Sequence, residues 1–81
     1  MVELAQLRFF GPLRDVTKTS SLDVDVATVD DAVAMAVHLF GGDFARIMER
    51  SRVWVNGEPS DGTRKLAPGD EVALLPPVSG G

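Results

Sequence analysis

Hydrophobic and polar residues alternate in two segments of the first third of the chain. Residues 2–10 carry apolar side chains in both phases of a strand, whereas residues 20–26 place them at every second position with two aspartates between them. Because side chains alternate between the two faces of a strand, the second pattern is typical of a half-buried antiparallel strand. Gly11-Pro12 is expected to break the first strand with a turn.

The apolar spacing changes to that of a helix after residue 27. Thr28 can accept a hydrogen bond from the backbone N–H of Asp31 and so cap a helix. One stripe of that helix is apolar at three- and four-residue spacing: Ala32, Val33, Ala36, Val37 and Phe40. Gly41-Gly42 is expected to end it. Asp43 is expected to cap a short second helix with Phe44, Ile47 and Met48 facing inward.

The last part of the chain predicts strands separated by turns. Residues 53–55 form a short strand, and Asn56-Gly57 is a strong hairpin signal. Residues 58–67 are weakly patterned and are assigned as strand or loop. Residues 71–75 form the last strand, and Pro76-Pro77 ends it because proline cannot donate a hydrogen bond to a sheet.

These elements predict an α+β fold, in which a mixed sheet packs on one main helix with a short second helix. A length of 81 residues suits a single domain. We assign residues 1–77 to that domain and residues 78–81 to an extended C-terminal tail.

Composition excludes several classes of function. The formal net charge is −4 with only eight Lys and Arg residues, so nucleic acid is not an expected partner, and a basic partner surface suits the charge better. The absence of cysteine excludes a disulfide scaffold, a thiolate metal site and a cysteine nucleophile. No apolar run approaches the roughly 20 residues that span a membrane, and no secretory signal is visible. We therefore expect a cytoplasmic protein with no membrane association.

Side chains suited to catalysis are scarce. The single histidine, His38, falls near the end of the predicted helix without an orienting partner, which favours a surface position over a catalytic role. The paired aspartates are explained by a solvated strand face and a helix start, and no metal site is predicted. Trp54 fits either a partner-binding anchor or packing against the helix.

The tail is the candidate functional element. Two prolines project the chain in an extended form, and the residues that follow become progressively smaller: Val78, Ser79, Gly80 and Gly81. Without Cβ atoms, the two glycines can enter a narrow site and bring the Gly81 carboxylate close to other groups. The alternative is a flexible end or linker remnant, since Gly-Gly is also common in linkers.

Three segments resemble one known family. Residues 69–81, which end in Pro-Pro-Val-Ser-Gly-Gly, resemble the end of the small, sulfur-carrying subunit of molybdopterin synthase, of the MoaD/ThiS group. Residues 7–14 are similar to the family's first strand and turn, and residues 55–57 to its hairpin. The resemblance covers essentially the whole chain and implies a ubiquitin-like β-grasp fold with the first and last strands parallel at the centre.

The resemblance also implies a chemistry and partners. An E1-like adenylating enzyme would use ATP to activate the Gly81 carboxylate, and sulfur would then convert it to a thiocarboxylate. Residues 76–80 would enter the active site of the large synthase subunit, in a heterotetramer, and sulfur would pass to cyclic pyranopterin monophosphate. This chain would bind no cofactor or metal and would not be an enzyme on its own.

An apolar patch beside the tail is implied as the partner-binding surface. Phe10 and Leu75 match patch positions and fall in the outward phase of their strands, although ordinary sheet core is the alternative. Pro59 matches a third position, where an aliphatic side chain is more usual. Three other hypotheses remain open: a carrier for thiamine, cysteine or tRNA thiolation, a ubiquitin-like protein modifier, and a plain interaction domain.

Overall fold

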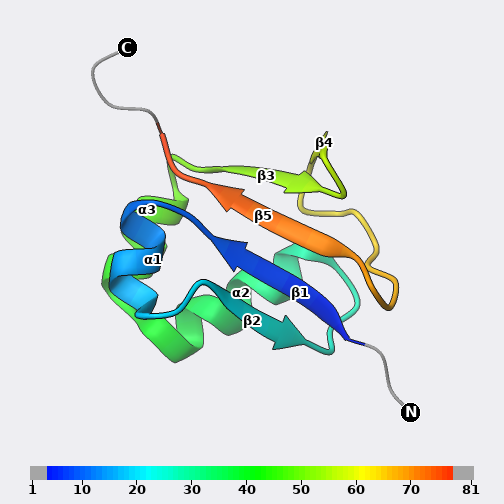
Figure 1. The fold of residues 1–81 in the computed structure, drawn as a ribbon, viewed down its shortest axis with the longest axis horizontal. Coiled ribbons are helices and arrows are strands. Elements are labelled where there is room, and N and C mark those ends of the chain that lie inside the picture. Colours follow the sequence, from blue (N-terminus) through cyan, green and yellow to red (C-terminus); the bar gives the residue numbers. More distant parts are fainter. Residues whose placement is uncertain (1–3, 78–81) are drawn as a thin grey trace.

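The computed structural model describes residues 4–77, which form a five-stranded sheet with three helices on one side (Figure 1). The elements follow one another along the chain as β1 (Ala5–Phe9), α1 (Pro12–Thr17), β2 (Ser21–Val24), α2 (Val29–Phe40), α3 (Gly42–Met48), β3 (Arg52–Val55), β4 (Glu58–Ser60) and β5 (Glu71–Leu75). The α+β class is confirmed.

The sheet is mixed, and its strand order is β2-β1-β5-β3-β4. β1 and β5 are parallel neighbours at the centre, with Leu7 opposite Val72 and Phe9 opposite Leu74. The other neighbours are antiparallel. The first and last strands therefore meet as the β-grasp arrangement requires, and β5 brings the chain from the centre of the sheet to the tail.

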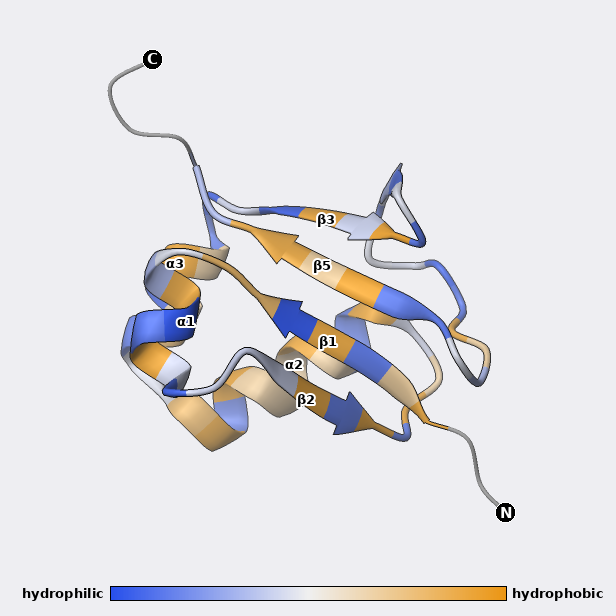
Figure 2. Ribbon diagram, viewed as in Figure 1, coloured by the Kyte–Doolittle hydropathy of each residue, from blue (hydrophilic) through white to orange (hydrophobic). Residues whose placement is uncertain are grey.

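The core lies between the inner face of the sheet and the helices. Its strand residues alternate with more exposed ones, and Figure 2 shows the resulting alternation of apolar and polar positions along β1. The largest fully buried side chains are Phe9, Phe44, Leu7, Leu13, Leu74, Val24, Val29, Val55 and Val72. Phe9 is the hub of an aromatic cluster, because its ring meets those of Phe40 and Phe44 edge-on at centroid distances of 5.6 and 5.8 Å.

Three local predictions are confirmed. The Thr28 hydroxyl accepts a hydrogen bond from Asp31 N at 3.2 Å, which caps α2 at the predicted residue. Asn56 and Gly57 both have positive φ, 52° and 83°, as a tight hairpin turn between β3 and β4 requires. Phe44 is buried, and Ile47 and Met48 pack against the core.

Other predictions need correction. The turn expected at Gly11-Pro12 leads into the unpredicted helix α1, since proline is well suited to a first helical position. Both early strands are shorter than predicted within the described residues. Gly41, rather than Asp43, precedes α3 as its cap. The segment 58–67, assigned as strand or loop, contains both, because residues 58–60 are strand and the rest is mostly irregular. Leu39, next to Phe40 at the end of α2, is 56% exposed and lies outside the core.

Candidate functional site

The outer face of the sheet, on the side away from the helices, carries the predicted partner-binding residues Phe10 and Leu75. Phe10 directly follows β1 and is 40% exposed, whereas Leu75 ends β5 and is half-buried. The parallel register continues from Phe9 opposite Leu74, so Phe10 and Leu75 are neighbours at the end of the sheet where the chain leaves it. Their predicted outward phase is confirmed, and ordinary sheet core is excluded for Phe10.

Pro59 lies one row away from these two residues. It is exposed and paired with Trp54, and Trp54 is in turn paired with Ala73 on β5. Pro59 therefore lies near Trp54 rather than beside Leu75. The outer-face patch, defined here as Phe10, Leu75, Trp54 and Pro59, spans two rows of the sheet.

Trp54 is the patch residue that sequence reasoning left unresolved. Its neighbour Val55 is fully buried on the inner face, so the alternation of β3 directs Trp54 to the outer face, where it is 36% exposed. The phase of Val53-Trp54-Val55 was the available signal. A large, partly exposed aromatic next to exposed apolar groups is typical of a binding surface.

The start of the tail is held by the turn after β1. Gly11 has φ 53° and ψ −130°, a conformation that residues with a side chain rarely adopt. A Cβ added to Gly11 would lie 3.4 Å from Cγ of Pro76, so the two segments pack closely. The predicted tail residues Val78, Ser79, Gly80 and Gly81 lie outside the described residues. Pro76 and Pro77, which precede them, are the last residues that the structure describes.

We expect Gly11→Ala to destabilise the protein by about 1–3 kcal/mol, because a Cβ is unfavourable at this backbone conformation. Gly42→Ala is a matched control, since Gly42 begins α3 and a Cβ there meets no atom within 4 Å. The control should be neutral or stabilising by up to about 1 kcal/mol. Urea unfolding of both variants measures the difference, and equal stability of the two would contradict the strain assigned to Gly11.

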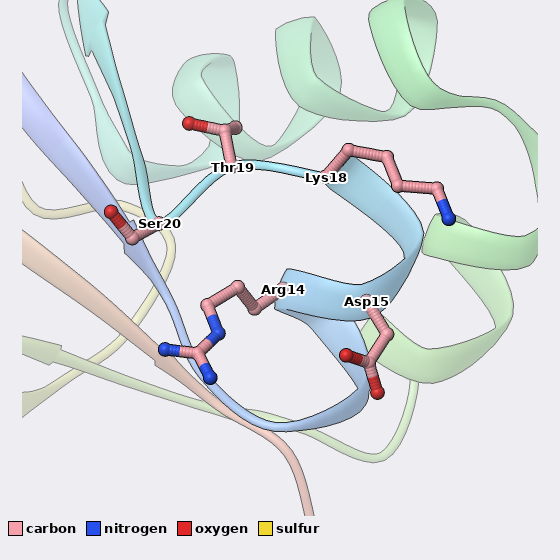
Figure 3. Close-up of a pocket in the computed structure, with 5 residues that line it drawn as sticks. All are labelled: Arg14, Asp15, Lys18, Thr19 and Ser20. Carbon is pink, nitrogen blue, oxygen red and sulfur yellow. The ribbon is translucent and has the colours of Figure 1, made fainter.

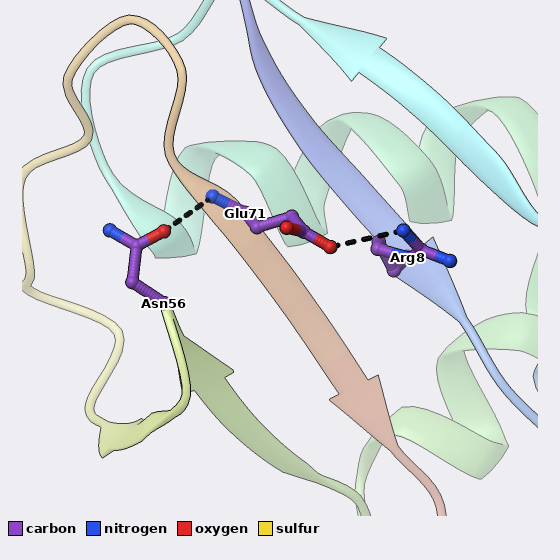
Figure 4. Close-up of polar contacts among 3 residues, drawn as sticks. All are labelled: Arg8, Asn56 and Glu71. Carbon is purple, nitrogen blue, oxygen red and sulfur yellow. Dashed lines mark hydrogen bonds and ion pairs between the residues drawn. The ribbon is translucent and has the colours of Figure 1, made fainter.

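Polar contacts fix the opposite end of β5. Asn56 Oδ1 accepts a hydrogen bond from Glu71 N at 2.9 Å, and Arg8 pairs with the Glu71 carboxylate at 3.0 Å (Figure 4). Asn56 Nδ2 also donates to Asp70, whose carboxylate accepts a further bond from Ala67 N. These two hydrogen bonds lower the pKa of the Asp70 carboxyl, and the bond from the Ala67 N–H has the larger effect. This network joins two turns to the start of β5 and has a structural role.

The other candidates for chemistry among residues 4–77 are a histidine, a possible metal site and a surface hollow. His38 is exposed in the last turn of α2, as expected. No group of three or more His, Asp or Glu side chains in this range is arranged to hold a metal ion, and none of its helices is long and apolar enough to span a membrane. An open hollow near α1 is lined by Arg14, Asp15, Lys18, Thr19 and Ser20. Figure 3 shows that their side chains point in different directions, so they do not converge on one ligand.

Comparisons with known proteins bear on this geometry. The model of the ThiS family matches residues 7–81. Small archaeal modifier protein 1 of Haloferax volcanii is 36% identical over 85 residues, covering 91% of this chain and 97% of that protein. Its crystal structure superimposes with a TM-score of 0.83 at 33% identity, covering 95% of this chain and 98% of that one.

Two solved complexes contain chains of the same fold. The BexX/CysO complex of Amycolatopsis orientalis contains a chain with a TM-score of 0.78 and 26% identity, covering 95% of this chain and 99% of that one. A complex of subunits 1 and 2 of the molybdopterin-converting factor of Helicobacter pylori gives a TM-score of 0.74 at 24% identity, with 96% and 99% coverage. At that identity, the second likeness shows the fold alone.

The family match begins at Leu7 within β1 and runs through the rest of the sheet to Gly81, and the fold is the ubiquitin-like β-grasp of these relatives. The chain therefore belongs to the ThiS family and is a ubiquitin-like sulfur carrier of the ThiS/MoaD type.

Proposed function

We propose that the reactive group of this protein is the carboxylate of Gly81 and that partner enzymes perform all of the chemistry on it. The observation that carries the proposal is the family match through Gly81, on a body whose central strand β5 leads directly to the tail.

The proposed cycle begins with ATP on an E1-like adenylating enzyme. A carboxylate is a poor electrophile, so one Gly81 oxygen attacks the α-phosphate of ATP, pyrophosphate leaves, and an acyl-adenylate forms. The terminal sulfur of a persulfide then attacks the acyl carbon and displaces AMP. A thiol cleaves the remaining S–S bond and leaves a thiocarboxylate, so a chain without cysteine carries sulfur at its own carbonyl carbon.

For the acceptor, we propose cyclic pyranopterin monophosphate in the active site of the large molybdopterin synthase subunit. The support is the resemblance of the Pro-Pro-Val-Ser-Gly-Gly tail to that of the small synthase subunit. In this role the chain is the sulfur-donor subunit and binds no cofactor or metal itself. The outer-face patch would contact the partner while the tail enters its active site, and Trp54 and Phe10 are the two aromatic residues of the patch.

A second candidate is attachment to other proteins through Gly81. It is favoured by the 36% identity to small archaeal modifier protein 1, whose name describes it as a modifier. Both candidates need the same adenylation and differ only in the acceptor. Transfer in the cysteine pathway or another thiolation pathway differs in the same way.

Intact-mass spectrometry tests the proposed activation of Gly81 and its conversion to a thiocarboxylate. Incubation with an adenylating enzyme, ATP and a persulfide donor should replace one oxygen of Gly81 by sulfur. An unchanged mass, with an enzyme that thiolates a known carrier in the same assay, would refute the proposal. Adding the large synthase subunit and pyranopterin should then return the original mass and yield dithiolene, whereas higher-mass protein conjugates that depend on Gly81 would instead support the modifier.

A further inference from the structure

A hollow opens beside the tail exit, on the helix side of the molecule. Its volume is about 490 Å³, and three separate segments line it: Pro12, Arg46, Ile47, Glu49, Arg50 and Pro77. α1 packs against α3 here, at the end of the sheet where β5 ends (Figure 1). Because Pro77 forms part of the wall, an enzyme that takes up residues 78–81 must approach this hollow.

Charge differs between the two ends of the sheet. Asp70, Glu71 and Glu58 gather where β5 begins, since Glu58 pairs with Val55 and Val55 pairs with Val72. At the other end, Arg52 is paired with Leu75, and the hollow adds two more arginines. A chain with a formal net charge of −4 thus presents three arginines beside its tail exit. The expectation of a basic partner rested on the negative net charge, but this part of the surface is positive.

The two arginines of the hollow are available to a partner. Arg46 pairs with Asp43 at 3.3 Å, but both side chains are about three-quarters exposed (77% and 74%), and such a surface pair contributes little. Arg50 is exposed and forms no ion pair among residues 4–77. Glu49 is the only carboxylate in the wall of the hollow.

We propose that this hollow is a second docking site, separate from the outer-face patch, for an acidic segment of the enzyme that adenylates Gly81. The inference rests on the proposed function. Carboxylates of the segment pair with Arg46 and Arg50, whose guanidinium groups suit bidentate contact. An apolar side chain between them lies against Pro12, Ile47 and Pro77, walls that suit a peptide better than a free phosphate.

The two docking surfaces would hold the base of the tail from both sides. The outer-face patch lies on one side of Pro76-Pro77 and the hollow on the other. Contact on both sides fixes the direction in which the chain leaves the body, and such positioning favours productive entry of the carboxylate into an active site.

The test compares two double charge reversals of equal net charge. R46E/R50E changes the hollow, and R64E/K65E changes an exposed loop near the start of α2. Both are measured by ATP–pyrophosphate exchange with an adenylating enzyme that accepts a known ThiS-family carrier. We expect R46E/R50E to raise KM for the carrier by about tenfold or more with kcat within about twofold, and R64E/K65E to change KM by less than about threefold. Added salt should raise the wild-type KM more than that of R46E/R50E.

Each other outcome overturns a stated claim. If the wild-type chain is not adenylated, the proposed function fails and the inference fails with it. If the wild type is adenylated and R46E/R50E keeps its KM, the inference alone fails. ¹⁵N spectra of the isolated chains decide whether the hollow holds the chain's own tail: Gly80 and Gly81 amide shifts that move in R46E/R50E, relative to wild type and R64E/K65E, would overturn a partner segment as the occupant.

Discussion

Phe9→Ala is expected to destabilise this protein by about 3–5 kcal/mol, the usual range for removing a buried aromatic ring from a core. Phe9 is only 2% exposed, and its ring contacts both Phe40 and Phe44 edge-on. A domain of this size is held by only about 4–12 kcal/mol in total. The midpoint of thermal unfolding should therefore fall by about 15 °C or more, and part of the population should be unfolded at moderate urea concentrations.

The adjacent Phe10→Ala is the matched control, because it removes the same group from the next residue of the chain. Phe10 is 40% exposed on the outer face, so the loss should be about 1 kcal/mol or less. If the outer-face patch contacts the tail-receiving enzyme, this variant should instead lose affinity in a pull-down. Similar unfolding midpoints for the two variants would contradict the assignment of opposite faces to neighbouring residues.

Sequence patterns predicted the elements whose local signals agree with their tertiary role. Thr28 both caps α2 and precedes a long apolar stripe, and Asn56-Gly57 can adopt the positive φ values of a tight turn. α1 was missed because its six residues are too few to show helical periodicity. Its position depends on Leu13, which is fully buried against the rest of the fold, and no local pattern reveals such a contact.

The candidate site was predictable to the extent that it follows strand phase. The outward direction of Phe10 and Leu75 followed from alternation, and the same reasoning applied to β3 would have placed Trp54 beside them. The register between strands could not be predicted from the sequence, so only the structure shows that Pro59 pairs with Trp54. The hollow joins Pro12, residues 46–50 and Pro77, which are distant in sequence, so only the tertiary structure brings it into view.

The largest functional effect is expected from one alanine added after Gly81. The Gly81 carboxylate then becomes a peptide carbonyl, and the new carboxylate is displaced by about 3.4 Å and carries a methyl group beside it. An active site shaped for two glycines should not accept this end, since misplacing reacting atoms by about 1 Å can lower a rate by about a hundredfold. We expect the extended chain to form no detectable thiocarboxylate by intact-mass spectrometry, with an unchanged midpoint of thermal unfolding because the core lies within residues 5–74.

The same alanine added at the amino end provides the control for chain length and composition. Strand β1 begins at Ala5, which is also the first residue that pairs with β2. A residue added before Met1 should therefore leave both thermal unfolding and thiolation as in the wild type. Thiolation of the carboxy-extended chain at the wild-type rate would show that the position of the terminal carboxylate does not matter. In that case, the proposal that partner enzymes act on Gly81 would have to be abandoned, because the chemistry would not depend on which atom ends the chain.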